Sequence, residues 1–382
     1  MNLTRRFLVA LLAAAVLLSA LPALSMSVSD YNAHDVEKLR AFFSQEGGSG
    51  YTNGRVINGS TFDIDDPSTW KKCTWNAEGR LESLAFDNLG WNVAGALDLS
   101  GCTGLVSLTG RDCELSSVDV SDCTQLRSLY VTGNLIAGLS IENTPSLNVL
   151  WVDHNLLTEL DVSANPLLSS LDCSYNSIAL LDVTSCPALT MLRCSNNPIA
   201  ALDVSNCPLI TEFSCKSTEI SELDISNLTS LRAFYCFNTK LTRLEASVFN
   251  GGESFVIEAV GPGYIGFRTY LGSSVTYKAS SLAQEGFSFA GWYLDGMRVS
   301  DAADITLAFG EGEKLLRAYF YELGDVDHSL SVDSTDALLA LRCALGIITQ
   351  DELDPVLADF DQNGVLDSAD SLLILRRALG IS

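Results

Sequence analysis

The sequence predicts a modular protein that combines a leucine-rich solenoid of short parallel β-strands, a small β domain and a C-terminal all-α module with two calcium loops. Three observations predict this architecture. Leucines recur with a constant period, as at Leu105, Leu126 and Leu147, a segment rich in glycine and aromatic residues follows, and an acidic segment occurs twice, from Asp325 and again from Asp359. A chain of 382 residues has room for two to four such domains.

The first 25 positions, 1–25, have the pattern of an export signal. Arg5 and Arg6 precede an apolar run over 7–21, and small residues follow it, so we expect cleavage after Ser25. An uncleaved membrane anchor is the alternative. No second long apolar run follows, so the mature chain is expected to lack a membrane span and to be secreted. The net charge of −24 argues against nucleic acid and anionic membrane surfaces as partners.

The cysteines of the chain follow the repeat rather than a disulfide framework. Four of them recur with the same period as the leucines, and four others share a second repeat position. A cysteine fixed to one position of a repeat acts as a small buried apolar residue, and stacked strands hold equivalent positions too far apart for a typical bridge. We therefore expect mostly free, buried thiols. The two columns are Cys173, Cys194, Cys215 and Cys236, and Cys102, Cys123, Cys186 and Cys207.

The repeat covers residues 81–250, after a cap over 26–80 in which His34 to Ser44 has helical character. Each unit reads Leu-x-x-Leu-x-Val/Cys-x-x-Asn, and its alternating part predicts a short strand with one buried face. One unit cannot bury this face alone, so the units must stack. The asparagine column is expected to satisfy backbone groups in the turns; it comprises Asn134, Asn155, Asn176 and Asn197.

This pattern, with its recurrent Leu-Asp-Val-Ser segments, resembles the 21-residue bacterial units of the leucine-rich-repeat superfamily. Strand alternation predicts two outward columns on the concave face, and their exposed aromatic and charged residues are candidate contacts for a protein or a glycan. Scattered surface aromatics are the alternative interpretation. The candidates are Tyr130, Trp151, Asp153, Arg193, Tyr235 and Phe237.

Residues 251–322 predict a small β domain. Phe255 to Val260, Ser274 to Ala279 and Leu315 to Phe320 read as strands, and Gly261-Pro262-Gly263 marks a turn. The string from Gly286 to Gly296, with its Gly-Trp-Tyr segment, resembles internalin B-repeats of bacterial surface proteins. That resemblance implies a spacer, in which Trp292 and Tyr293 belong to the core.

The duplicated segment within 323–382 places oxygen-bearing residues at the spacing that calcium requires, with side chains at loop positions 1, 3, 5, 9 and 12 and a carbonyl at position 7. The second copy is nearly complete. In the first copy serine replaces asparagine and Leu330 replaces the turn glycine, so we expect strain and a weaker site. The two sets are Asp325, Asp327, Ser329, Ser331, Asp333 and Asp336, and Asp359, Asp361, Asn363, Val365, Asp367 and Asp370.

Each loop leads into one short amphipathic helix, which ends at Gly346 or Gly380. Two EF-hand-like loop–helix units that lack the entering helix resemble a type I dockerin. The resemblance implies two Ca²⁺ ions and a cohesin of a scaffoldin as partner. It also implies cohesin contacts at two equivalent sets, so that a single and a dual binding mode both stay open. The sets are Ser334, Thr335, Arg342 and Cys343, and Ser368, Ala369, Arg376 and Arg377.

No nucleophile–base pair or catalytic motif is found in the sequence, and the three histidines fall in the cap helix, beside a repeat asparagine and inside a calcium loop. We therefore expect a non-catalytic, extracellular component of a cellulosome-like complex. Two alternatives are an internalin-like surface adhesin with a calcium-stabilised tail, and an enzyme with a cryptic site.

Overall fold

The computed structural model describes residues 27–48, 50–245, 255–260, 263–271, 275–284, 287–300, 302–307, 314–329 and 331–381. The expected export signal therefore lies outside the described residues. The chain forms two compact units, residues 1–146 and 147–382, and each is described by itself. Among the described residues, no helix combines the length and apolar character that crossing a bilayer demands.

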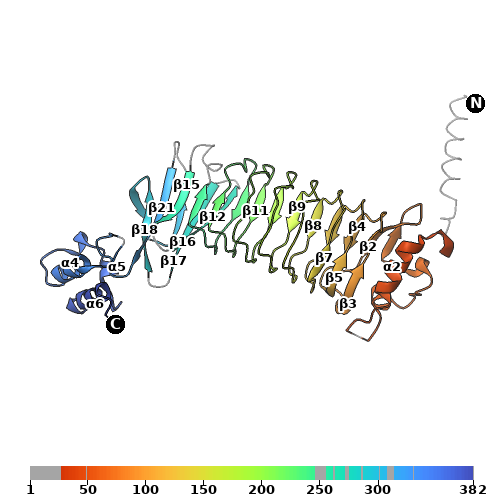
Figure 1. The fold of residues 1–382 in the computed structure, drawn as a ribbon, viewed down its shortest axis with the longest axis horizontal. Helices are drawn as coiled ribbons and strands as arrows, with labels where there is room; N and C mark the ends of the chain where they lie inside the picture. The colour runs from red at the N-terminus through yellow and green to blue at the C-terminus, as the bar shows by residue number, and fades with distance from the viewer. Residues whose placement is uncertain are drawn as a thin grey trace, which may run out of the picture. The chain divides into compact units, whose positions relative to one another are not determined.

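The first unit begins with the predicted cap. The side chain of Asn32 accepts a hydrogen bond from the backbone of Asp35, which fixes the start of the expected helix. This helix packs Leu39, Phe42 and Phe43 into the interior of the unit. The elements of the cap are η1 (Val28–Asp30), α2 (Ala33–Phe43), α3 (Asn53–Asn58), η2 (Pro67–Thr69) and β1 (Cys73–Trp75) (Figure 1).

A buried ion pair joins the cap to the first repeat. The Asp35 carboxylate is fully buried and binds the Arg80 guanidinium at 3.1 Å through both of its oxygens. One of these oxygens also accepts the backbone N–H of Leu81 at 2.9 Å. A buried charge is tolerated only when it is paired and hydrogen-bonded in this way, so the cap fits specifically against the repeat that follows.

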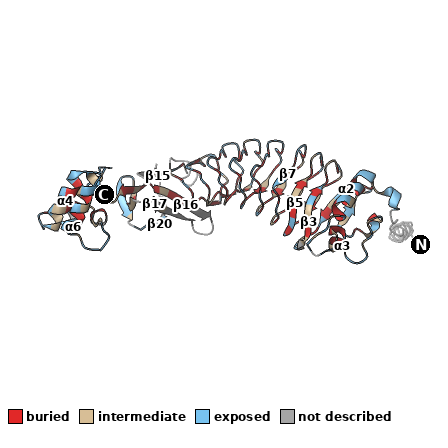
Figure 2. Cartoon of the chain, turned by 60° about the horizontal axis from the view of Figure 1, so that its bottom comes forward, coloured by how far each residue is buried: buried red, intermediate tan, exposed pale blue. Residues whose placement is uncertain are grey.

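Two sheets continue the first unit. β1 pairs antiparallel with the first repeat strand, and from there the strands of one sheet run parallel. That sheet contains β2 (Leu81–Ala85), β4 (Ser107–Thr109) and β6 (Ser128–Tyr130). The other contains β3 (Gly90–Asp98), β5 (Cys113–Asp119) and β7 (Gly138–Ser140). Buried residues run along β3 and β5, as Figure 2 shows.

In the second unit the repeats continue as the predicted solenoid of short parallel strands. Leu171 lies opposite Leu192, and Leu192 lies opposite Phe213, so the strand register equals the period of the sequence repeat. The parallel strands are β8 (Val149–Trp151), β9 (Ser170–Asp172), β10 (Met191–Arg193), β11 (Glu212–Ser214) and β13 (Ala233–Tyr235). A second pair consists of β12 (Glu222–Asp224) and β14 (Arg243–Glu245).

The asparagine column satisfies turn backbone, as expected. The side-chain N–H groups of Asn176 donate to the carbonyls of Val152 and Cys173, both at 3.0 Å, and its oxygen accepts the N–H of Leu157 at 2.9 Å. One side-chain amide thus ties this turn to the preceding repeat. In the last repeats threonines take this position, and Thr218 donates to the carbonyl of Cys215 at 2.8 Å.

The β segment after the repeats extends both repeat sheets. β16 (Gly263–Leu271) pairs antiparallel with β13, and β15 (Phe255–Val260) pairs antiparallel with β14. The interpretation of this segment as a spacer is therefore incomplete, because it also covers the strand edges that the last repeat would otherwise expose. Its strands are β15 (Phe255–Val260), β16 (Gly263–Leu271), β17 (Val275–Ala283), β18 (Phe287–Leu294), β19 (Met297–Ser300), β20 (Asp304–Leu307) and β21 (Lys314–Glu322).

Aromatic packing fills the interior of this β segment. Trp292 is fully buried, and its ring centroid lies 5.8 Å from that of Phe289, which in turn lies 5.6 Å from Phe320. The assignment of Trp292 to the core is confirmed. Tyr293 is only half-buried, with its ring edge against Tyr319. The predicted turn at 261–262 lies outside the described residues.

The C-terminal module consists of two loop–helix units around a shared core that includes Ala337, Ala340 and Ile374. A single helical turn of four residues precedes the second loop, which is too short to be the entering helix of a full EF-hand. Pro355 occupies the first position of this helical turn. A backbone N–H at that position has no hydrogen-bond partner within a helix, so proline, which lacks one, is well suited to it. The helices are α4 (Ser334–Ala344), η4 (Gln350–Glu352), α5 (Pro355–Ala358) and α6 (Ser368–Ala378).

All eleven cysteines are free thiols, and nine of them are buried, which confirms the expectation for both columns. Burial raises the pKa of Cys194 to about 12 and that of Cys186 to about 11. Cys343, which is half-buried on α4, has a pKa raised by burial and by the charge of Glu352.

Native thiols are therefore expected to react slowly with an aromatic disulfide reagent at pH 8. A raised pKa leaves little thiolate at this pH, and only Cys73 and Cys343 are not fully buried. We expect at most two thiols to react in the native chain, all eleven in guanidinium, and the fastest to disappear in Cys343→Ser. More than two fast thiols in the folded chain would contradict the buried columns.

Candidate calcium loops and repeat face

The first loop gathers three carboxylates. One oxygen each from Asp325, Asp327 and Asp336 lies within 4.8 Å of the others, and two of the three side chains are fully buried. Asp336 accepts the backbone N–H of Val326 at 2.8 Å and that of Asp333 at 2.8 Å. Burial and the nearby charge of Asp327 raise the pKa of Asp336, although backbone hydrogen bonds oppose the shift. Such a cluster is stable as carboxylates when a cation neutralises it.

The second copy of the duplicated segment repeats this arrangement. Oxygens of Asp359, Asp361 and Asp370 lie within 4.8 Å of one another. Asp359 accepts the backbone N–H groups of Asn363 at 3.1 Å and Gly364 at 2.8 Å. The backbone of the loop thereby wraps around the first carboxylate, which fixes the position of the remaining ligands.

The donor set of both loops fits calcium. The candidate ligands are carboxylate, hydroxyl, amide and carbonyl oxygens, and calcium prefers six to eight oxygens in a flexible shell. The clustered aspartates would hold the ion, with Ser329 and the carbonyl of Ser331 in the first loop and Asn363 and the carbonyl of Val365 in the second. Bound there, calcium would supply positive charge that holds the loop closed around the carboxylates.

The ninth position of each loop also starts the helix that follows. Asp333 accepts the N–H of Thr335 at 2.6 Å, and Asp367 accepts that of Ala369 at 2.6 Å. Backbone hydrogen bonding from Thr335 lowers the pKa of Asp333. Each carboxylate that is predicted to bind calcium thus also caps a helix, so calcium binding there would link loop closure to helix formation.

Sequence reasoning placed the left-handed residue of the first loop at Leu330, which lies outside the described residues. The structure has positive φ at the fourth loop position of both copies, 61° at His328 and 57° at Gln362, and 84° at Gly364. The His328 ring stacks on Tyr321 with centroids 4.0 Å apart and bonds Asp354 at 3.2 Å. These contacts offset the cost of a non-glycine residue there.

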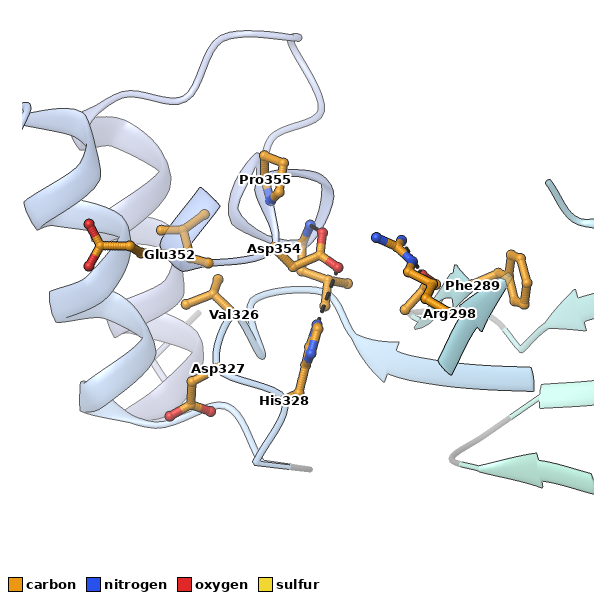
Figure 3. A pocket seen from close by; sticks show the side chains of 11 residues that line it. Phe289, Arg298, Val326, Asp327, His328, Glu352, Asp354 and Pro355 are labelled. Atoms are coloured by element: carbon orange, nitrogen blue, oxygen red, sulfur yellow. Dashed lines mark hydrogen bonds and ion pairs between the residues drawn. The ribbon is translucent and has the colours of Figure 1, made fainter. Parts of the chain in front are cut away.

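A cavity of about 590 Å³ lies beside this histidine. Figure 3 shows Phe289 and Arg298 of the β segment on one side, with Val326, His328 and Asp354 on the other. The Arg298 guanidinium donates to the carbonyl of Ala290 at 2.6 Å. The cavity therefore lies between the first loop and the β segment.

The residues expected to contact a cohesin lie at the surface of α4 and α6. Seven of the eight are exposed, whereas Cys343 is half-buried and packs against the shared core. Arg377 differs from its counterpart because its guanidinium binds the Glu322 carboxylate at the end of β21, with Nε 2.7 Å from Oε1. Cys343 has no charge with which to form an equivalent ion pair. The two copies are thus related in fold but differ in chemistry.

Sequence reasoning missed the exposed apolar residues of these helices. Leu338 and Leu372 are 54% and 57% exposed, and Leu345 and Leu379 are 63% and 61% exposed. Each pair is related by the duplication. Exposed leucines that recur at equivalent positions of two helices form matching apolar patches, which is typical of a docking surface. The duplication itself was the signal that could have found them. A third such pair is Ile347 and Ile381.

On the repeats, four of the six candidate ligand-face residues line one cavity of about 420 Å³. These are Asp153, Arg193, Tyr235 and Phe237. Trp151 ends β8 and donates its indole N–H to Ser170 at 2.9 Å, and Tyr130 ends β6 in the first unit; neither lines the cavity. Four of the candidate ligand contacts therefore lie together, on the face of the repeats formed by the strands from β8 to β13.

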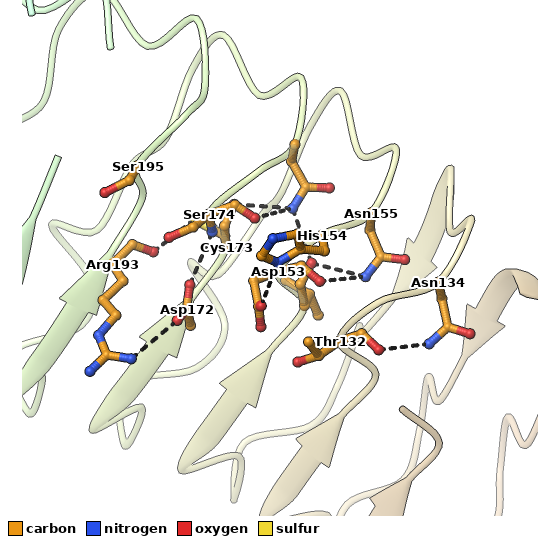
Figure 4. A network of polar contacts seen from close by, with 12 residues as sticks. Thr132, Asn134, Asp153, His154, Asn155, Asp172, Cys173, Ser174, Arg193 and Ser195 are labelled. Carbon is orange, nitrogen blue, oxygen red and sulfur yellow. Dashed lines mark hydrogen bonds and ion pairs between the residues drawn. The ribbon is translucent and has the colours of Figure 1, made fainter. Parts of the chain in front are cut away.

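Arg193 belongs to a polar network in this cavity, and Figure 4 shows its guanidinium directed at Asp172. Its guanidinium binds Glu212 at 2.6 Å and lies 3.6 Å from Asp172. Burial raises the pKa of Asp172, and a hydrogen bond from Ser174 opposes the shift. Burial lowers the pKa of Arg193, but the hydrogen bonds and charges of Glu212 and Asp172 together outweigh it, so the pKa is raised. One guanidinium therefore lies between two carboxylates from the adjacent repeats.

Two further lining residues, His154 and Tyr175, were not among the predicted contacts. Both have left-handed backbone, with φ of 53° and 54°, at a turn position that recurs once in every repeat. Their rings stack with centroids 4.2 Å apart, and His154 also bonds Asp153 at 2.9 Å. No sequence pattern indicates them, because the residue type at this turn position changes from repeat to repeat.

Comparison with known proteins identifies one domain by family. The dockerin type I domain matches residues 323–379. No protein of curated function matches the chain.

Solved structures similar to the chain include the functional domain of InlJ from Listeria monocytogenes, described as including a cysteine ladder. It is 20% identical over 59% of this chain and 69% of that one, with a TM-score of 0.36. A leucine-rich-repeat protein from Leptospira interrogans is 23% identical over 39% and 41%, with a TM-score of 0.36. YopM from Yersinia enterocolitica is 21% identical over 43% and 44%, with a TM-score of 0.32. The chain thus spans less than half of the last two proteins.

Proposed function

We propose that this protein is a secreted, non-catalytic component of a cellulosome-like complex, attached through its C-terminal module to a cohesin of a scaffoldin. The observation that carries the proposal is the pair of carboxylate clusters, Asp325, Asp327 and Asp336 and their equivalents, in a segment that matches the dockerin type I domain. Dockerin type I domains bind calcium, and a cohesin is the partner that this domain implies.

Both loops are proposed to bind calcium, the first more weakly. The second loop offers the amide oxygen of Asn363 and a glycine at the turn, and its backbone already encloses Asp359 through two hydrogen bonds. In the first loop Ser329 donates its hydroxyl hydrogen to the carbonyl of Ser331 at 3.1 Å. Both oxygens are proposed ligands, so calcium must compete with this contact.

The cohesin surface is proposed to combine the exposed polar residues of each copy with the apolar patches of the helices. Ser334, Thr335 and Arg342 would surround Leu338 in the first copy, and their equivalents would surround Leu372 in the second. An apolar centre with a polar rim is the usual anatomy of a specific protein interface. The proposed domains are the cap (26–80), the repeats (81–250), the β segment (251–322) and the docking module (323–382). The repeats would carry a second recognition face in addition to the docking module.

Capture of the full chain by a panel of immobilised cohesins, with calcium and with chelator, tests this function. We expect at least one cohesin to capture the chain in the presence of calcium. Addition of chelator should lower the apparent affinity of that cohesin for the chain by about 100-fold or more. The loops shape the docking helices only when the metal is bound, so the loss should be reversed by added calcium.

A chain that binds calcium but is captured by no cohesin would contradict the assembly role and favour an internalin-like adhesin with a calcium-stabilised tail. Hydrolase activity on plant polysaccharides or peptides would contradict the non-catalytic assignment.

A further inference from the structure

We propose that the cavity around Arg193 on the strand face of the repeats binds a neutral oligosaccharide. This inference rests on the proposed recognition role of the repeats and names the class of ligand. The cavity holds about 420 Å³, within the range of small-molecule sites, and its lining residues come from consecutive repeats. A sugar unit of a longer chain fits a site of this size.

The charges of the cavity favour a ligand without net charge. Arg193 is paired with both Asp172 and Glu212, which lie on either side of it, and the cavity as a whole has three carboxylates and two cations. Lys216 lies over the Phe237 ring, with Nζ 5.8 Å from the centroid, and Asp153 is bonded to His154. A polyanion requires cations that are not already paired, and a cationic peptide requires carboxylates that are not already paired. Neither would gain much here.

Donors and acceptors lie side by side along the floor of the cavity. The hydroxyls of Ser195 and Ser214 are buried and 2.8 Å apart, and each can accept or donate. Planar carboxylate and guanidinium groups from Asp172, Glu212 and Arg193 line the same cavity. A polyhydroxylated ligand needs this combination, because each of its hydroxyls both donates and accepts.

Aromatic rings at the cavity supply the apolar component. Tyr175 is 46% exposed and is held by its stack on His154, and Tyr235 and Phe237 line the same cavity. The C–H face of a sugar packs on an aromatic ring of this kind. Because the stack on His154 already fixes the orientation of the Tyr175 ring, less side-chain entropy is lost on binding. None of the lining residues is aliphatic, so the apolar surface of the cavity consists of aromatic rings.

Binding to an array of neutral gluco-, xylo- and manno-oligosaccharides, beside uronate-containing glycans and basic and acidic peptides, tests the inference with the full chain. Calorimetric titration with the best neutral oligosaccharide follows. We expect Tyr175→Ala and Glu212→Gln each to weaken binding about 10-fold or more, which corresponds to the loss of one stacking contact or one charge-balanced contact. Tyr51→Ala and Glu222→Gln, matched changes at exposed residues outside the cavity, should leave binding unchanged.

Absence of binding to every neutral oligosaccharide would overturn the inference. So would neutral binding that survives both cavity variants, or a preference for uronates or peptides that depends on the same residues. Thermal unfolding of each variant separates loss of binding from loss of fold. Cohesin capture is measured on the same proteins, so failure of the sugar site leaves a different signature from failure of the docking role.

Discussion

The Asp361→Ala variant is expected to lose the tighter of two calcium sites, whereas Asp327→Ala loses the weaker one. The two aspartates are equivalent by the duplication, both are exposed, and each accepts one backbone N–H, from Asn363 at 3.1 Å or from Ser329 at 3.0 Å. Their removal is therefore a matched pair. Mutation of a residue that only hydrogen-bonds a metal ligand typically lowers metal affinity by roughly 10–100-fold. Loss of a direct ligand should lower calcium affinity by more than this.

The consequence for stability follows from linkage. A ligand that binds only the folded module at about 100 times its Kd adds roughly 2.7 kcal/mol to the free energy of unfolding. Because Asp333 and Asp367 cap α4 and α6 and are also proposed ligands, loss of calcium should loosen both helices as well as the loops. The repeats have a core separate from that of the C-terminal module and should stay folded.

Calorimetric titration of the full chain with calcium measures the number of sites and their affinities, and hydrogen exchange locates the loosened segments. Asp203→Ala, at an exposed aspartate of the repeats that caps a turn through Ser205 at 2.8 Å, is the control and should bind calcium like the wild-type chain. Equal affinities for both loops would contradict the proposed ranking. Exchange that increases in the repeats on chelation would contradict the independence of the two parts.

The repeat region was predictable because each of its constraints recurs. Leu171, Leu192 and Phe213 are one repeat period apart in sequence and face each other in adjacent strands, so period and register are the same information. The same holds for the asparagine column and the buried thiols. In the C-terminal module the spacing of oxygen-bearing residues is dictated by the ion, so the carboxylates that cluster in the structure were identified in advance.

Features that depend on contacts between different segments were not predictable in this way. The pairing of β16 with β13 joins strands of unrelated sequence, and no periodicity connects them. Left-handed turns at His154 and Tyr175 are enforced by the geometry of the solenoid, which selects the conformation and leaves the residue type open. The ion pair of Arg377 with Glu322 likewise depends on how the last strand meets the final helix.

The docking helices give the second large effect. The double variant Leu338→Asp, Leu372→Asp is expected to abolish cohesin capture, by 100-fold or more, while calcium binding persists. Both leucines are more than half exposed and lie outside the shared core, so the folded module tolerates the change. An aspartate at the centre of an apolar contact would be buried without a partner, and such a penalty reaches several kcal/mol.

The single variants decide between the two binding modes. If both copies can dock, each single change leaves the other face intact and capture falls only slightly, whereas a single mode makes one single variant as severe as the double. Leu180→Asp, at a leucine of the repeats that is 76% exposed, introduces the same charge elsewhere and should not affect capture. Capture that survives the double variant would place the cohesin contacts away from these patches. Both copies have an exposed leucine at this position, and docking to a cohesin is the explanation proposed for this. Capture by the double variant would therefore leave the two exposed leucines without an explanation.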